Sequence, residues 1–183
     1  IYWDCGNNGS GYDRISRAAT ISEMEGQWNF WTFTKNASTG IMYIFLNGSL
    51  WHSGSGKTKP ISINRMNLGR SIANNYGYYG SLDEFSMWSI ALDSVAISDI
   101  MYHSITPSNP AYANLLVYYK MDESSGALID DSSPNGMDGT MFNMTRRDRR
   151  GKDLFRNFTE SLERPKISFI RGVYTTSVQV TPV

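Results

Sequence analysis

Between residues 27 and 99 the chain consists of apolar, aromatic-rich segments separated by short polar ones. The first apolar segment starts near Trp28 and leads through a polar, glycine-containing loop into a second, Ile41–Leu46. The second segment ends at Asn47-Gly48, and Asn-Gly beside apolar runs is the strongest short-range signal of a β-hairpin. The pattern therefore predicts consecutive antiparallel strands.

The rest of this region and the start of the chain follow the same pattern. A third strand is expected around 82–88 and a short helix before Asp99, and Ile1–Asp4 has the composition of a strand. Aromatic residues make up 13% of the chain and glycines number 16, which suits an all-β protein with many turns. With 183 residues, the chain can bury a sizeable core in one or two domains.

Several short motifs occur in the order found in one family of extracellular modules. They are Trp28 with Thr34, Leu46-Asn47-Gly48, Leu68-Gly69-Arg70 and Gly80-Ser81-Leu82-Asp83-Glu84, before the expected helix. In this order of motifs the chain resembles the laminin-G-like, concanavalin A-like lectin/glucanase modules. The resemblance implies an all-β fold, namely an antiparallel β-sandwich of the jelly-roll, concanavalin A-like type with one short helix.

The opening motif of such modules is displaced in this chain. It occurs at Val117–Gly126, and the motif that follows it in the family occurs at Asp130–Thr140. Either the segment from Leu115 starts a second module, or it folds back to complete one sandwich within 1–143. The second arrangement is favoured, because half a sandwich would expose unpaired strand edges.

The remaining residues do not match the module. Residues 144–162 are expected to be a connector, and 163–183 the start of a further β module. The connector contains the one strong charge run, in which Arg147-Asp148-Arg149-Arg150 fits the pattern of furin-like cleavage sites. A solvated connector and a polyanion-binding tract are the alternatives.

Charge and cysteine content argue against several classes. The formal net charge is zero, so no overall field attracts nucleic acid or an anionic membrane, and no apolar run approaches the ~18 residues of a membrane span. The single cysteine, Cys5, can make no internal disulfide.

Asparagine-containing tripeptides indicate a secreted or cell-surface glycoprotein of which this chain is one segment. In the pattern Asn-x-Ser/Thr, the glycan acceptors are Asn8, Asn36, Asn47, Asn143 and Asn157. The alternative is that a chain rich in Asn, Ser and Thr forms such tripeptides by chance.

Catalysis is not expected. Gly54–Thr58 ends like a phosphate-binding loop, but Trp51 stands where the first Gly belongs, and a strand rather than a helix is expected at 59–63. Glucanases of the family need paired carboxylates beside the scissile bond. The nearest acidic pair, Asp83 and Glu84, would lie on opposite faces of a strand.

By resemblance to the family, a calcium ion is expected between the loop around 131–135 and the strand that follows Gly80. Its ligands would be Asp131, Asn135 and Asp83, since calcium takes about six to eight oxygens from carboxylates, amides and carbonyls. The alternative is an Asx-turn, in which Asp131 and Asn135 bond only their own backbone.

A sugar-binding surface is expected where aromatic rings and amide side chains share a loop. The predicted ligand-binding residues are Trp51, Asn74, Asn75, Tyr76, Tyr78 and Tyr79. The alternative is that one or two of the tyrosines pack over the edge of the sandwich.

A second surface is expected on the outward face of the strand Ile41–Leu46. The leucine of the motif sets Met42, Ile44 and Leu46 inward, which leaves an apolar outward face, and outward apolar residues are usually covered by something. The predicted interface residues are Ile41, Tyr43, Phe45 and Trp88. A second core on a curved sheet is the alternative.

The sequence thus predicts a non-catalytic extracellular binding or scaffolding module of a large surface or secreted glycoprotein. Such a module would mediate adhesion or assembly with neighbouring modules, other surface proteins or copies of itself. The alternative is a calcium-dependent, lectin-like carbohydrate-binding module attached to a polysaccharide-active protein.

Overall fold

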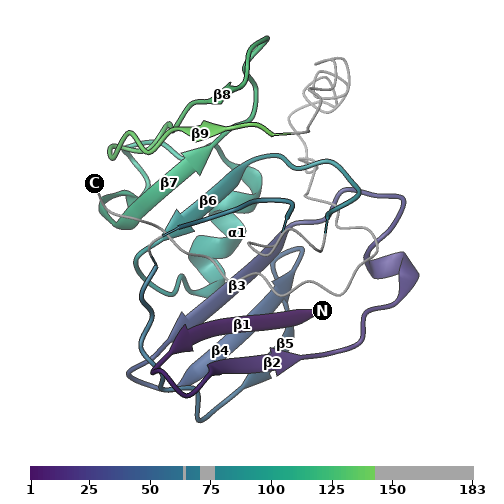
Figure 1. Ribbon diagram of the computed structural model, residues 1–183, viewed down its shortest axis with the longest axis vertical. Helices are drawn as coiled ribbons and strands as arrows, with labels where there is room; N and C mark the ends of the chain where they lie inside the picture. The colour runs from purple at the N-terminus through teal and green to yellow at the C-terminus, as the bar shows by residue number, and fades with distance from the viewer. Residues whose placement is uncertain (64, 71–76, 143–183) are drawn as a thin grey trace. The chain divides into compact units, whose positions relative to one another are not determined.

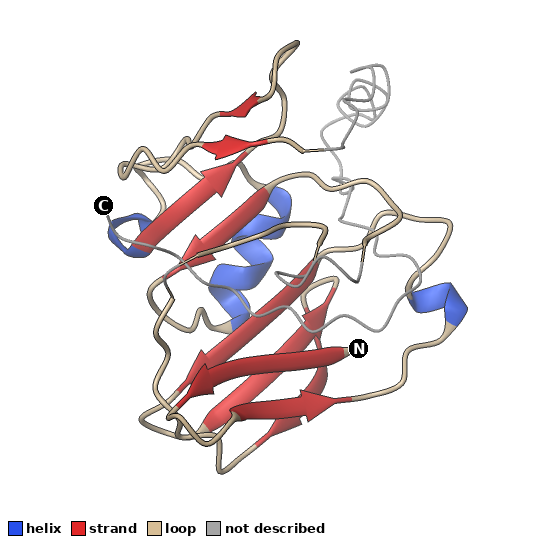
Figure 2. Cartoon of the chain, in the orientation of Figure 1, coloured by secondary structure: helices blue, strands red, loops and turns tan. Residues whose placement is uncertain are grey.

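The structure, a computed structural model, describes residues 1–63, 65–70 and 77–142 (Figure 1). The described residues belong to two compact units, one within 1–81 and one within 82–142. Antiparallel strands predominate in both (Figure 2). One α-helix and two 3₁₀ helices are present among the described residues. The connector expected at 144–162, its basic run and the β segment expected at 163–183 lie outside the described residues.

The first unit is built from two antiparallel sheets. Its strands are β1 (Tyr2–Asn7) paired with β2 (Tyr12–Ser16), and β3 (Trp31–Asn36), β4 (Ile41–Leu46) and β5 (Ser49–Gly54) in that order, with the 3₁₀ helix η1 (Ile21–Glu23) between the sheets in sequence. Asn47 and Gly48 connect β4 to β5 with φ values of 52° and 78°. Positive φ at both central residues is the geometry of a type I′ turn, so the predicted hairpin is confirmed.

The core of the first unit forms from the inward faces of both sheets. Met42 and Ile44 of β4 are fully buried, as the predicted inward phase requires, and Ile15 of β2 packs with them. Trp3 of β1 reaches the core from the hairpin, with its ring 5.4 Å from that of Phe33 on β3. The alternation of side chains along each strand therefore joins the two sheets through one apolar layer.

A buried ion pair lies at one end of this layer. Lys35 Nζ on β3 donates to Asp13 Oδ2 at 2.7 Å and to the carbonyl of Cys5 at 2.8 Å, and both charged side chains are buried. The amide of Lys59 also donates to Asp13, at 2.9 Å. Burial alone would raise the pKa of Asp13, but the hydrogen bonds and charges of Lys35 and Lys59 lower it below its ordinary value.

The strand start predicted at 59–63 is wrong. These residues have no regular secondary structure, because the amide of Lys59 is taken by Asp13 and Pro60 has no amide proton to give to a sheet. The carbonyl of Pro60 instead accepts a hydrogen bond from Asn7, at 2.9 Å. The segment is held beside the β1–β2 hairpin as an irregular strap.

The second unit contains short strands and the α-helix. Its elements are β6 (Phe85–Trp88), α1 (Ser94–Tyr102), η2 (Tyr112–Asn114), β7 (Leu115–Tyr119), β8 (Leu128–Ile129) and β9 (Gly139–Thr140). Asp93 caps the helix, because its side chain accepts a hydrogen bond from Ala96 at 2.8 Å. Ile105, Leu115 and Tyr118 form a buried cluster, and Ile100 of α1 packs on it. The helix therefore contacts residues of β7.

The segment that starts near Leu115 pairs with a strand of the preceding motif. β7 is antiparallel to β6, and Phe85 lies opposite Tyr119. Asp83 and Glu84 precede β6 rather than lying within a strand as predicted, because Glu84 has a φ of 53°. Glu84 accepts a hydrogen bond from the hydroxyl of Tyr118.

We expect Gly6→Ala to destabilise the first unit far more than Gly9→Ala. Both glycines have positive φ, 78° and 87°, so both substitutions carry the backbone strain of that region. A Cβ at Gly6 would overlap the carbonyl oxygen of Lys59 and lie 2.5 Å from Lys35 Nζ, whereas a Cβ at Gly9 would meet no atom of the described residues within 4 Å. In urea unfolding, the free energy of unfolding should fall by about 3 kcal/mol or more for Gly6→Ala and by about 1 kcal/mol for Gly9→Ala. Equal losses would contradict the close approach of the Lys59 strap.

Candidate functional site

The residues predicted to bind a ligand differ in their exposure to solvent. Trp51 is buried, with 8% of its surface exposed, whereas Tyr79 is 78% exposed. Tyr78 is half-buried. Asn74, Asn75 and Tyr76 lie outside the described residues. Tyr79 is therefore the predicted aromatic residue that the structure places at the surface.

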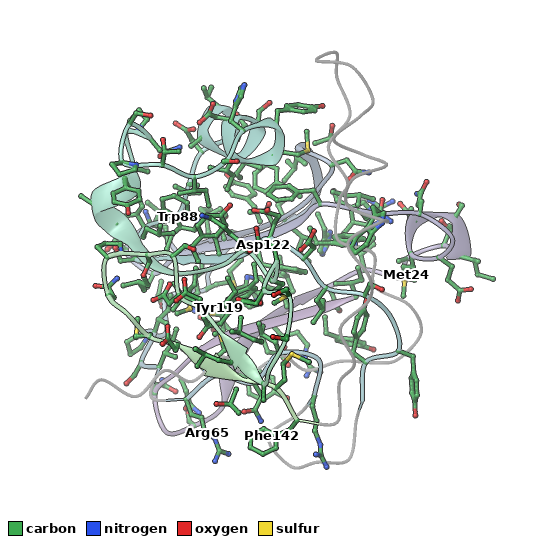
Figure 3. The ribbon with its side chains drawn as sticks, turned by 90° about the horizontal axis from the view of Figure 1, so that it is seen from above. Met24, Arg65, Trp88, Tyr119, Asp122 and Phe142 are labelled. Carbon is green, nitrogen blue, oxygen red and sulfur yellow. The ribbon has the colours of Figure 1, made fainter. Side chains whose placement is uncertain are left out.

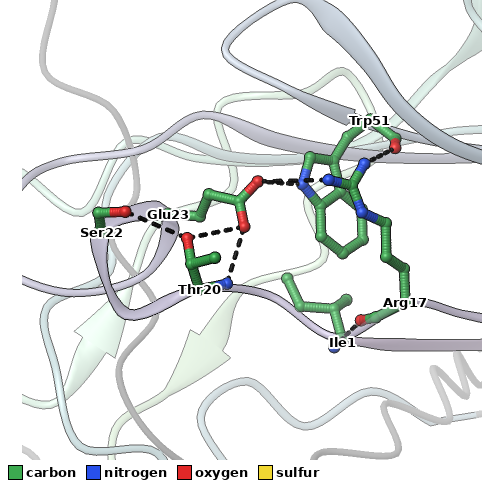
Figure 4. A network of polar contacts seen from close by, with 6 residues as sticks. All are labelled: Ile1, Arg17, Thr20, Ser22, Glu23 and Trp51. Carbon is green, nitrogen blue, oxygen red and sulfur yellow. Dashed lines mark hydrogen bonds and ion pairs between the residues drawn. The ribbon is translucent and has the colours of Figure 1, made fainter.

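The predicted surface position of Trp51 is wrong, because a polar network and the core hold this ring (Figure 4). Its indole N–H donates to Glu23 Oε1 at 2.7 Å, and its ring lies edge-on to Trp31 at 5.3 Å. The guanidinium carbon of Arg17 lies 4.4 Å from its ring centre, and Arg17 Nη1 donates to its carbonyl at 2.6 Å. No sugar can stack on a ring that is covered in this way.

Glu23 organises the same network. Its Oε2 accepts hydrogen bonds from the amide and the hydroxyl of Thr20, at 2.8 and 3.0 Å. The backbone hydrogen bond from Thr20, followed by that from the Trp51 indole, lowers the pKa of Glu23 below its ordinary value. The ionised carboxylate thus joins η1 to β5.

Tyr79 projects from a short turn that its neighbours hold in place. The amide of Tyr78 donates to the carbonyl of Gly69 at 2.7 Å, and Gly77 forms an isolated β-bridge with Arg70. The hydroxyl of Tyr78 donates to the carbonyl of Ser81 at 3.2 Å. Tyr78 therefore closes the turn, while the ring of Tyr79 faces solvent.

A second aromatic surface was missed in the sequence. On the outward face of the β1–β2 hairpin, Arg14 lies opposite Asp4, with Tyr2 and Tyr12 beside it. We call these four side chains the tyrosine–arginine platform. The signal was present as Tyr-x-Asp in one strand and Tyr-x-Arg in the next, since side chains two residues apart share a face.

The predicted interface residues are mostly covered. Phe45 is only 7% exposed, so it is not available to a partner as predicted. Trp88, which is labelled in Figure 3, is half-buried. It packs on the cluster that contains Leu115 and Tyr118. Ile41 is half-buried and Tyr43 is exposed. The interface stays a prediction, with Tyr43 as its exposed member.

The residues predicted to bind calcium hold a loop by hydrogen bonds. Asp131 Oδ1 accepts from the amides of Tyr118 and Ser133 at 2.8 and 2.9 Å, and Oδ2 accepts from the Ser133 hydroxyl and the Met137 amide at 2.7 and 2.8 Å. Asn135 donates to the carbonyls of Leu115 and Leu116 at 2.9 and 3.0 Å. Burial alone would raise the pKa of Asp131, but the hydrogen bonds from Tyr118, Ser133 and Met137 lower it below its ordinary value.

This arrangement does not fit a calcium ligand set. A carboxylate has about four lone-pair positions, and donors occupy as many on Asp131. Within the part of the chain that the structure describes, no three Asp, Glu, His or Cys side chains come together to hold a metal ion. The calcium site stays a prediction that this loop geometry does not support.

Two of the predicted glycan acceptors are exposed, and the side-chain amide of a third is hydrogen-bonded within the protein. Asn8 and Asn36 are exposed, and Asn36 Nδ2 has no hydrogen-bond partner among the described residues. Asn47 instead uses both ends of its amide: Oδ1 accepts from Phe30 at 2.9 Å, and Nδ2 donates to the fully buried Asn29 at 3.1 Å. Asn143 and Asn157 lie outside the described residues.

We expect Asp131→Asn to destabilise the protein by about 1–3 kcal/mol, because in either orientation the new NH₂ group faces hydrogen-bond donors. These are the amides of Tyr118 and Ser133 on one side, and the Ser133 hydroxyl and Met137 amide on the other. The neighbouring Asp130→Asn is the matched control, since Asp130 is exposed. Thermal unfolding of the wild type should be the same with calcium and with a chelator. A melting temperature that rises with calcium would contradict the hydrogen-bonded loop and restore the calcium site.

Comparisons with known proteins agree with the architecture. A family model described as the concanavalin A-like lectin/glucanases superfamily matches residues 1–98. A crystal structure of a candidate carbohydrate-binding protein from Bacteroides ovatus is similar with a TM-score of 0.53 at 20% identity. That similarity covers 73% of this chain and 38% of the other, so the chain spans less than two fifths of its length.

The search of curated proteins found no match. Among the described residues, no helix has the length and apolar character needed to cross a membrane. The family match covers more than half of the 183 residues and confirms the resemblance stated from the motifs. The chain belongs to the concanavalin A-like lectin/glucanase superfamily and has the antiparallel β-strand architecture expected of its sandwich fold.

Proposed function

We propose that the chain is a non-catalytic carbohydrate-binding module that binds glycans through the exposed ring of Tyr79. The observation that carries the proposal is the exposure of this ring on a turn fixed by Tyr78. Tyrosine offers an apolar face for stacking together with a polar hydroxyl, and a fixed turn lowers the entropic cost of binding. The similar fold of a candidate carbohydrate-binding protein gives further support.

The placement of the acidic pair supports the non-catalytic part of the proposal. Hydrolysis of a glycosidic bond needs two carboxyl groups that flank it. Asp83 is buried, and Glu84 accepts a hydrogen bond from the hydroxyl of the buried Tyr118, so neither carboxylate is presented to a substrate.

Adhesion at the cell surface is the second candidate function, because Asn8 and Asn36 are exposed in Asn-x-Ser tripeptides and Tyr43 is an exposed aromatic residue on β4. In this function the module is part of a secreted or surface glycoprotein. Its partners are neighbouring modules or other surface proteins.

We expect Tyr79→Ala to weaken glycan binding at least about tenfold, as truncation of an aromatic anchor usually does. A glycan array should first identify a bound sugar, with chelator present, and titration calorimetry should then compare the variants. Tyr102→Ala is the matched control, because Tyr102 is an exposed tyrosine at the end of α1. Absence of any bound glycan, or equal affinity of Tyr79→Ala and wild type, would refute the proposal.

We expect the folded protein, when secreted from eukaryotic cells, to carry a glycan at Asn36 and none at Asn47. A glycan on Asn47 Nδ2 would have to fit against the buried Asn29. Asn36 is exposed, and its Nδ2 has no hydrogen-bond partner in the part of the chain that the structure describes. Peptide mass spectrometry before and after deglycosylation measures the occupancy of each site. Folded material with full occupancy at Asn47 would show that the turn tolerates the modification. An unmodified Asn36 would remove this support for a surface glycoprotein.

A further inference from the structure

The tyrosine–arginine platform has the construction of a binding site rather than of an ordinary surface ion pair. Arg14 Nε and Nη2 donate to the two oxygens of Asp4, each at 2.6 Å, and Nη2 also donates to the hydroxyl of Tyr12 at 2.9 Å. Such a bidentate pair fixes the plane of the guanidinium. Hydrogen bonding to Asp4 raises the pKa of Arg14 above its already high ordinary value, so the guanidinium stays charged.

Two aromatic rings flank the fixed guanidinium. Its carbon lies 4.8 Å from the centre of the Tyr2 ring and 5.0 Å from that of Tyr12. These distances are within the range of cation–π contacts. Asp4 is 6% exposed, whereas Tyr12 is 51% exposed, so a buried carboxylate anchors an open aromatic surface.

The inward face of the same hairpin holds the platform in place. Asp13, between Tyr12 and Arg14 in sequence, is bound to Lys35 and to the amide of Lys59. Trp3, between Tyr2 and Asp4, packs on Phe33. Because neighbouring residues of a strand point to opposite faces, these inward contacts fix the backbone from which the platform projects.

We propose that the tyrosine–arginine platform is a second carbohydrate site, which takes neutral pyranosides. This inference rests on the proposed function, and it uses residues separate from the Tyr79 turn. The face of Tyr12 offers a surface for the C–H groups of a pyranose ring. Arg14 Nη1, which has no partner among the described residues, and the hydroxyl of Tyr12 offer hydrogen bonds to sugar hydroxyls.

The charge of the platform selects neutral sugars. The positive charge of Arg14 and the negative charge of Asp4 cancel at contact distance. A uronate or sulfated sugar would gain no net attraction and would have to compete with Asp4 for the guanidinium. Binding of a neutral pyranoside involves no change in charge, so its affinity should depend little on salt.

The test is a backbone-amide NMR titration of the whole chain with neutral hexasaccharides of glucose and of mannose, and with oligogalacturonate as the anionic comparison. We expect a neutral hexasaccharide to shift the amides of β1 and β2 both in the wild type and in Tyr79→Ala. Tyr12→Ala should weaken this site at least about tenfold, whereas Tyr12→Phe, which keeps the ring, should retain most of the affinity. Tyr102→Ala is again the control.

Each other outcome separates the two proposals. Binding that depends on Tyr79 without shifts in β1 and β2 overturns the platform site alone. Shifts in the hairpin caused only by oligogalacturonate, and abolished by salt, overturn the choice of a neutral ligand. Failure of the wild type to bind any saccharide overturns both proposals. If Tyr12→Ala lowers the melting temperature, Tyr12→Leu, which keeps apolar volume without a ring, replaces it, and wild-type affinity of that variant overturns the platform site.

Discussion

The ion pair between Lys35 and Asp13 is the contact on which the first unit depends. It joins β3 to β2 inside an otherwise apolar layer, and it also binds the carbonyl of Cys5 on β1 and the amide of Lys59. Removal of one partner of such a buried pair usually costs about 3–5 kcal/mol, because the other charge is left without compensation. The pair therefore holds in register segments that are far apart in the sequence, and with them the outward face of the hairpin.

Carboxylates that accept several hydrogen bonds recur as organisers in both units. Asp13, Glu23 and Asp131 each accept several hydrogen bonds from amides or side chains of other segments, and each has a lowered pKa. Their stabilising effect is present above the ordinary carboxyl pKa of about 4 and is lost as the pH falls through the lower folded-state value. Asp13 and Asp131 are buried, and Glu23 is half-buried.

Local signals in the sequence predicted the fold well, and the side-chain environments less well. Asn47-Gly48 and the alternation along β4 correctly gave a hairpin and its inward face. The environment of Trp51 was missed because β4 and β5 change register there: Ile44 pairs with His52 and Phe45 with Leu50, so Trp51 is the extra residue of a bulge. Asp131 was assigned to calcium by resemblance to the family, but its oxygens accept hydrogen bonds from Ser133 and Met137 in its own loop and from the amide of Tyr118. The tyrosine–arginine platform was missed because it requires the pairing of two strands.

Formation of the turn at Asn47 and enzymatic glycosylation of this asparagine compete in time. A hairpin of this kind closes within about 1–10 μs, whereas a ribosome adds about 5–20 residues per second. The amide of Asn47 bonds to Asn29 and Phe30, which precede β3, so it can be engaged as soon as β4 and the turn have emerged and β4 pairs with β3. Enzymatic modification of this asparagine is then confined to the interval before this pairing. In any cell that glycosylates nascent chains, the occupancy of Asn47 would report the order in which this hairpin forms and is modified.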